Sequence, residues 1–135
     1  MKGSPKVSTT GEQRFVVGPN HVIDFAEAGM PAVLSTPWLI WLLEHAAREA
    51  VLPFLEPGES TVGTHIEVRH LAPTPLGQSV SCLARVVQGE GTFVSLQLEA
   101  RDEQELIARG FHRLRVIQVN RFAQKVHCKT LSGQR

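Results

Sequence analysis

Residues 38–52 (WLIWLLEHAAREAVL) limit the possible folds more than any other segment of the chain. These residues are good or acceptable helix formers, and Pro53 ends the run. Ser35-Thr36-Pro37 supplies the hydroxyl residue and the proline that are typical of a helix start. At about 1.5 Å per residue, the helix is roughly 22 Å long. Its first half is apolar nearly all round, which predicts a buried helix.

Strand patterns make up most of the remaining sequence. Polar and apolar residues alternate over residues 61–71, and turn residues separate this run from three later ones. The strands are expected at residues 14–18, 61–71, 79–88, 92–101 and 105–119. A sheet wrapped around one helix buries that helix on its concave face, so we predict an α+β fold. The domain is expected at residues 14–128, between a flexible tail of residues 1–13 and a flexible C-terminus of residues 129–135.

Charge and composition exclude several functional classes. The chain has 135 residues and a formal net charge of +1, which does not fit a dedicated nucleic-acid binder. No apolar run is long enough to span a bilayer, and residues 1–13 lack the apolar core of a secretory signal. Two cysteines and six histidines show no common metal-ligand spacing. We therefore expect a cytoplasmic protein without a metal or cofactor, small enough to need a partner chain around an enclosed site.

Glu44 is a carboxylate that directly follows the most apolar part of the predicted helix. Burial disfavours the ionised form, so the pKa of such a group rises and suits a general base or nucleophile. The alternative is an ion pair with Arg48, four residues further along the helix.

Two histidines share strand parity with apolar residues. His70 alternates in phase with Thr64, Ile66 and Val68, and His112 alternates in phase with the apolar residues that follow it. Each imidazole should therefore point toward the helix, either as a neutral base in a cleft or as a core histidine satisfied by a backbone carbonyl.

Thr36 stands at the predicted helix start, where a hydroxyl has two possible uses. As an N-cap it satisfies free N–H groups of the first turn. Because the same N–H groups suit a carbonyl oxygen that gains negative charge, Thr36 is also placed as a nucleophile or a substrate-orienting hydroxyl. The basic residues Arg121, Lys125, Lys129 and Arg135 are either solvated or in contact with a phosphate-bearing substrate.

Three segments resemble the fluoroacetyl-CoA thioesterase-like branch of the hot-dog proteins: STPWLIWLLEHAA, LEPGESTVGTHIEVRHLAPTPLG and VNRFAQKV. That branch has a catalytic Thr, a Glu eight positions later and a His twenty-six further on. Thr36, Glu44 and His70 match both spacings. The resemblance also implies a backbone contact to the thioester near Gly63 and Thr64, and sites between the subunits of a homodimer or dimer of dimers.

The resemblance implies a thioester hydrolase acting on a short-chain acyl-CoA. Met30 stands where fluoroacetyl-selective members have a lid aromatic, within residues 25–33, and Leu114 replaces an arginine of the last long strand. We expect Met30, Leu34, Trp38 and His112 to bind substrate. The alternatives are a non-catalytic hot-dog dimer that binds an acyl-CoA, and a hydratase-type lyase, whose usual Asp/His pair is absent at the matching positions.

The spacing from Thr36 to Glu44 sets a geometric condition. Eight helical residues rise about 12 Å, which is too far for the two side chains to touch along one regular helix. Either the chain unwinds at Ser35-Thr36-Pro37, or the site combines residues from two subunits.

Overall fold

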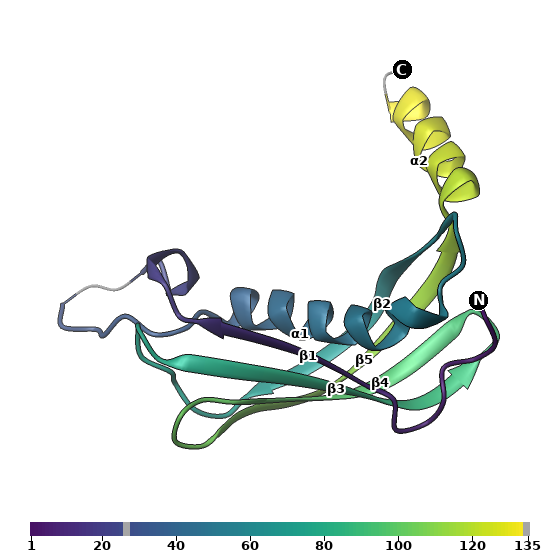
Figure 1. Cartoon of the computed structure of the whole chain (residues 1–135). Helices are drawn as coiled ribbons and strands as arrows, with labels where there is room; N and C mark the ends of the chain where they lie inside the picture. Colours follow the sequence, from purple (N-terminus) through teal and green to yellow (C-terminus); the bar gives the residue numbers. More distant parts are fainter. Residues whose placement is uncertain (26–27, 134–135) are drawn as a thin grey trace.

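The computed structural model describes residues 1–25 and 28–133. Its elements run in the order β1 (Thr10–Val16), η1 (Pro19–His21), α1 (Thr36–Val51), η2 (Leu52–Phe54), β2 (Glu59–His70), β3 (Ser79–Glu90), β4 (Phe93–Arg101), β5 (Leu106–Gln118) and α2 (Val119–Gly133), where η marks a short 3₁₀ turn. The five strands form one antiparallel sheet in the order β1-β3-β4-β5-β2. The sheet curls around α1 (Figure 1), as the sequence predicts for an α+β hot-dog fold.

The core lies between α1 and the concave face of the sheet. Seven residues of α1 are buried: Leu39, Leu42, Leu43, Ala46, Ala47, Ala50 and Val51. Alternate residues of β3 and β4 face them, and a fully buried Leu or Val side chain contributes about 1.5–3 kcal/mol. Gly11 of β1 lies so close to α1 that a Cβ there would overlap the backbone of Ala46 and Ala50. This approach fixes β1 against the helix.

The predicted parity of β2 is confirmed except at one residue. Ile66, Val68 and His70 are half-buried and face α1, while the residues between them are exposed. Thr64 was expected on the inner face, and this expectation is wrong. A bulge between Gly63 and His65 shifts the register, and the exposed Thr64 hydroxyl donates to the Arg113 carbonyl at 2.9 Å.

Both ends of the chain carry more structure than the sequence suggested. β1 begins at Thr10 because residues expected in the tail pair with β3, from Thr10 opposite Arg85 onward. Residues 119–133 form the helix α2, where we expected a strand ending at residue 119 and a flexible end from residue 129. The polar residues of β1 did not indicate a strand. In residues 119–133 the apolar residues recur at helical spacing, which accounts for α2. Residues 26–27, within the segment 25–33 compared with the lid, and Arg135 lie outside the described residues.

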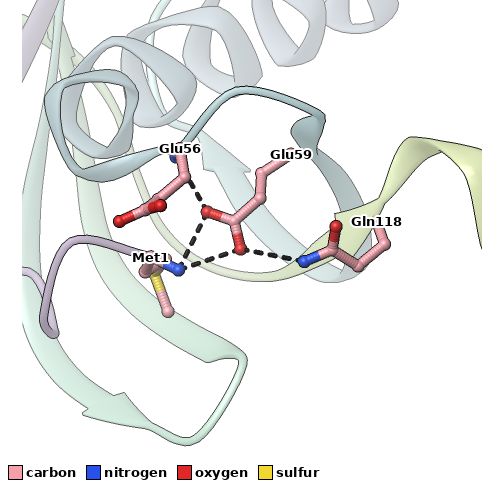
Figure 2. A network of polar contacts seen from close by, with 4 residues as sticks. All are labelled: Met1, Glu56, Glu59 and Gln118. Atoms are coloured by element: carbon pink, nitrogen blue, oxygen red, sulfur yellow. Dashed lines mark hydrogen bonds and ion pairs between the residues drawn. The ribbon is translucent and has the colours of Figure 1, made fainter.

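A polar network anchors the junction of β2, β5 and α2 (Figure 2). The Met1 ammonium group lies 2.8 Å from one Glu59 carboxylate oxygen and 2.9 Å from the other. The backbone N–H of Glu56 donates to Glu59 at 2.8 Å, and the Gln118 amide donates at 3.4 Å. The Met1 ammonium group and the Glu56 N–H lower the pKa of Glu59, and burial opposes them in part. Because Val119 N–H also bonds to the Gly58 carbonyl at 2.9 Å, the start of α2 is fixed beside the start of β2.

Candidate active site

The first residue of α1 and the last residue of β2 meet at one end of the sheet. Thr36 Oγ1 lies 2.9 Å from His70 Nδ1. Ser35 is the N-cap residue, and neither its side chain nor the Thr36 hydroxyl caps the first turn. The interpretation of Thr36 as a helix cap is therefore wrong, since its hydroxyl bonds to an imidazole instead. The helix start places this hydroxyl, and the end of β2 places the ring.

His70 has the electrostatic character of a neutral base. Burial lowers its pKa below the ordinary value of 6.5, and the nearby backbone of Ala72 opposes the shift in part. Its Nε2 atom is buried and has no hydrogen-bond partner among the described residues. Nδ1 contacts a hydroxyl rather than the backbone carbonyl expected of a core histidine. Nδ1 is therefore the ring nitrogen that faces the Thr36 hydroxyl.

Glu44 lies midway along α1 and belongs to a second group. Its carboxylate faces Gly63 of β2 and His112 of β5, at a cavity of about 180 Å³. The cavity is lined by Glu44, His45, Arg48, Thr61, Gly63, His112 and Leu114. Within residues 1–25 and 28–133, Glu44 forms no ion pair, so the expected pair with Arg48 is not formed. The carboxylate is thus left facing a cavity.

Gly63 is the position where β2 comes closest to this carboxylate. A Cβ at Gly63 would lie 2.6 Å from Glu44 Oε1 and 3.1 Å from His112 Cε1. A methyl group cannot fit at the first of these distances unless Glu44 moves. The glycine therefore permits the carboxylate to lie against the strand, next to backbone where the family resemblance implies a contact to the thioester.

His112 is buried, as its strand parity predicts, with 2% of its surface exposed. Its Nδ1 lies 3.0 Å from the His65 carbonyl, which accepts only, so Nδ1 carries the hydrogen and Nε2 is a free acceptor in the neutral ring. Burial lowers the pKa of His112, while the His65 carbonyl and the Glu44 charge oppose that shift. The ring therefore lies beside Glu44 in its neutral form.

One chain does not bring the two groups together. α1 is continuous from Thr36 through Glu44, so the chain does not unwind at the helix start. The rise of about 12 Å separates Glu44 from the Thr36–His70 pair. The structure therefore excludes unwinding at the helix start, and a site with residues from two subunits stays a prediction.

The residues expected to bind the acyl group differ in exposure. Met30 is 47% exposed and Trp38 36% exposed, whereas Leu34 is a core residue at 1%. Sequence reasoning missed two histidines beside the tryptophans. The His21 ring lies 5.0 Å from Trp38, and the His45 ring lies 3.8 Å from Trp41. Only the second had a sequence signal, because residues four apart share a helix face.

The described part of the chain contains neither a candidate metal centre nor a candidate membrane span. No group of three or more His, Cys, Asp or Glu residues there is arranged to hold a metal ion. No helix within it has the length and apolarity needed to cross a membrane.

Comparison with known proteins gives consistent matches in sequence and structure. Residues 17–120 match the family described as fluoroacetyl-CoA-specific thioesterase. The fluoroacetyl-CoA thioesterase of Streptantibioticus cattleyicolor is 36% identical over 141 residues, covering 98% of this chain and all of that protein. A Thermus thermophilus hypothetical protein, described as a thioesterase superfamily member, superposes with a TM-score of 0.90 at 28% identity, covering 99% of this chain and 98% of that one. A mutant fluoroacetyl-CoA thioesterase in complex with acetyl-CoA gives 0.85 at 34% identity, covering 93% and 98%.

Proposed function

The chain belongs to the fluoroacetyl-CoA-specific thioesterase family of hot-dog proteins, and on this basis we propose that it hydrolyses a short-chain acyl-CoA to the free acid and CoA. Membership makes it a thioester hydrolase. The observation that carries the proposal is the 2.9 Å contact between Thr36 Oγ1 and His70 Nδ1, a hydroxyl beside a neutral base. Trp38 follows Thr36 by two residues in α1, and we propose that the exposed Met30 and Trp38 contact the acyl group.

His70 acts as the general base. Nδ1 accepts a proton from the Thr36 hydroxyl, or from a water molecule held by it, as the oxygen attacks the thioester carbonyl. The tetrahedral intermediate collapses when the C–S bond breaks, and the CoA thiolate takes up the proton. If Thr36 is the nucleophile, water then hydrolyses the acyl-threonine; if water attacks directly, the acid forms in one step.

Glu44 supplies the negative charge of the site. It either orients the imidazolium that forms on His70 or directly activates the nucleophile, and both roles need the ionised carboxylate near the reacting atoms. Backbone N–H groups near Gly63 and Thr64, or at the start of α1, hold the oxyanion. Glu44 lies against Gly63, so the carboxylate would be close to a thioester that is held by the backbone near Gly63.

A second copy of the chain completes the site. β2 is an edge strand of twelve residues, and such an edge pairs readily with another chain. α1 lies mainly over β1 and β3, which leaves the inner face of β2 with little cover. Antiparallel pairing of β2 with the partner's β2 brings the Gly63 region of one chain toward the His70 end of the other. The assembly is a homodimer or a dimer of such dimers, acting in the cytoplasm, with no nucleic-acid or membrane partner.

Thiol release from a panel of acyl-CoAs, from acetyl to octanoyl and including fluoroacetyl, tests the activity. The wild-type protein should act best on the shortest acyl groups. Thr36→Ala, Glu44→Gln and His70→Ala should each lower the rate, with exposed Gln88→Ala as a matched control that leaves it unchanged. A wild-type protein that binds acyl-CoA without releasing thiol, and a His70→Ala variant that behaves like it, would establish a non-catalytic binding protein instead.

A further inference from the structure

α2 contrasts in charge with the rest of the molecule. It contains Arg121, Lys125 and Lys129 and no Asp or Glu. Residues 1–118, in contrast, hold ten Lys and Arg against thirteen Asp and Glu. The near-neutral net charge of the chain is therefore the sum of a negative net charge on residues 1–118 and a positive net charge on α2. A concentrated positive charge of this kind attracts polyanions at short range.

The three cations form one stripe along α2. Residues spaced by four share a helix face, so Arg121, Lys125 and Lys129 follow one another along about two turns. All three are exposed. They form no ion pair with any residue of the described chain, so the stripe is available to a ligand.

A second stripe on α2 is apolar and uncovered. Val119, Phe122 and Val126 share a face and are 43%, 41% and 49% exposed. Figure 1 shows α2 projecting from the end of β5, away from the sheet. An apolar stripe of this kind on an isolated protomer indicates a surface that another chain covers.

The position of α2 indicates which part of a second copy it meets. The Gly58 carbonyl and the Glu59 network fix its first turn beside the start of β2. Antiparallel pairing of two β2 strands reverses their ends, so the start of one strand lies toward the His70 end of the other. α2 then lies beside the start of the partner's α1, a segment in which Trp38 and Trp41 are exposed.

We infer that the basic stripe of α2 binds the phosphate groups of the CoA whose thioester occupies the site at that end of the partner. This assignment rests on the proposed function and names the part of the protein that holds the substrate's nucleotide. The apolar stripe packs α2 against the partner's Trp41, which is 47% exposed in one chain. The basic stripe, on the neighbouring face, meets the diphosphate and the 3′-phosphate with Lys and Arg side chains.

Neutralising the stripe tests the assignment. The full-length triple variant Arg121→Gln, Lys125→Gln and Lys129→Gln should raise KM for acetyl-CoA by about 10-fold to 100-fold, since each exposed charge pair contributes about a factor of two to five. Its kcat should stay near wild type. On acetyl-pantetheine, which has the thioester but no phosphate, the variant and the wild type should behave alike. The wild-type KM for acetyl-CoA should also rise with salt, and the variant should lose most of that dependence.

A matched control has the same change in charge elsewhere. Arg85→Gln, Arg101→Gln and Arg109→Gln remove three exposed cations from the outer face of the sheet and should leave KM unchanged. The triple variant Arg121→Lys, Lys125→Arg and Lys129→Arg keeps the three positive charges, so its KM should match wild type. Chromatography of each variant shows whether its oligomeric state is intact.

Binding of CoA, measured by calorimetry, separates this assignment from the proposed reaction. If no acyl-CoA is hydrolysed but the triple variant binds CoA 10-fold or more weakly than wild type, the phosphate site stands and the hydrolase proposal fails. If wild type releases thiol and the triple variant keeps its KM, the assignment is overturned alone. Equal losses on acetyl-CoA and acetyl-pantetheine, or binding of the stripe to anionic vesicles with an unchanged KM, would also overturn it.

Discussion

Thr36 and His70 contact each other within one chain, whereas Glu44 faces a cavity about 12 Å further along α1. The first group is complete as a hydroxyl and its base. The second combines a carboxylate, a glycine that makes room for it and a neutral histidine, and it has no reacting group of its own. The comparison teaches that one chain holds the hydroxyl–imidazole pair and the carboxylate as two separate groups, so their joint action in one site has to be tested.

Glu44→Gln should produce the largest effect and separates catalysis from stability. The amide keeps the shape of the side chain and removes its charge, so kcat should fall by about 10²–10⁴-fold. Because Glu44 forms no ion pair within the described chain, the Tm should change little. Thiol release and a thermal melt on the same preparation check both results. A large fall in Tm with little loss of rate would make Glu44 a structural residue.

Gly63→Ala should disturb the carboxylate without removing it. The new methyl group would lie 2.6 Å from Glu44 Oε1, so the side chain must move. We expect kcat to fall by about 10-fold to 100-fold, since small misplacements at a site are costly. Gly89→Ala in β3 is the matched control, because the nearest atom would be 3.6 Å away. Equal activity of both variants would mean that Glu44 has no fixed catalytic position.

The pH dependence reports on the other group. Burial lowers the pKa of His70 below 6.5. At pH values above that lowered pKa, the ring is neutral and can act as a base. kcat/KM should therefore rise with pH through that pKa and then level off, and Thr36→Ser should keep the same profile. A midpoint well above 6.5 would contradict the burial argument. Stopped assays of thiol release between pH 4.5 and 8 give the curve, within about the range where His titrates.

Glu59→Gln should have the smallest effect, because Glu59 belongs neither to the Thr36–His70 pair nor to the group around Glu44. The folded pKa of Glu59 is lowered, so the carboxylate contributes stability above its unfolded pKa, and this contribution is lost as pH falls through the folded pKa. The variant should melt a few degrees lower at pH 7 and show a weaker acid dependence of Tm. Its kcat should match wild type. An unchanged melting curve at every pH would show that the network in Figure 2 does not stabilise the junction.

Much of this fold could be predicted because its elements follow strong local patterns. The apolar run after Pro37 indicates a buried helix, and the alternation along β2 indicates a strand with one buried face. Together they predict a helix buried in a curled sheet. The start of β1 could not be predicted, since Thr10 and the polar residues after it are held by pairing with β3 rather than by their own preference. α2 was missed because a short apolar spacing between Phe122 and Val126 fits a helix or a strand equally well.

The site was predicted in part for a similar reason. Local patterns and the family resemblance pointed to Thr36, Glu44 and His70, and helix geometry showed that one regular helix cannot bring the first two into contact. It did not show that Thr36 contacts His70, because that contact depends on how α1 crosses the sheet. The bulge between Gly63 and His65 turns Thr64 outward, and the alternation of polar and apolar residues in β2 gives no sign of it.

Mixing two inactive variants tests the shared site most directly. Thr36→Ala and Glu44→Gln would be purified separately, combined, and allowed to exchange subunits after mild denaturation. If Glu44 of one chain serves Thr36 and His70 of the other, half of the chains in random mixtures form heterodimers with one intact site, and activity should recover to about one quarter of wild type. If each site lies within one chain, both sites of every heterodimer stay damaged, and the absence of recovery would contradict the account.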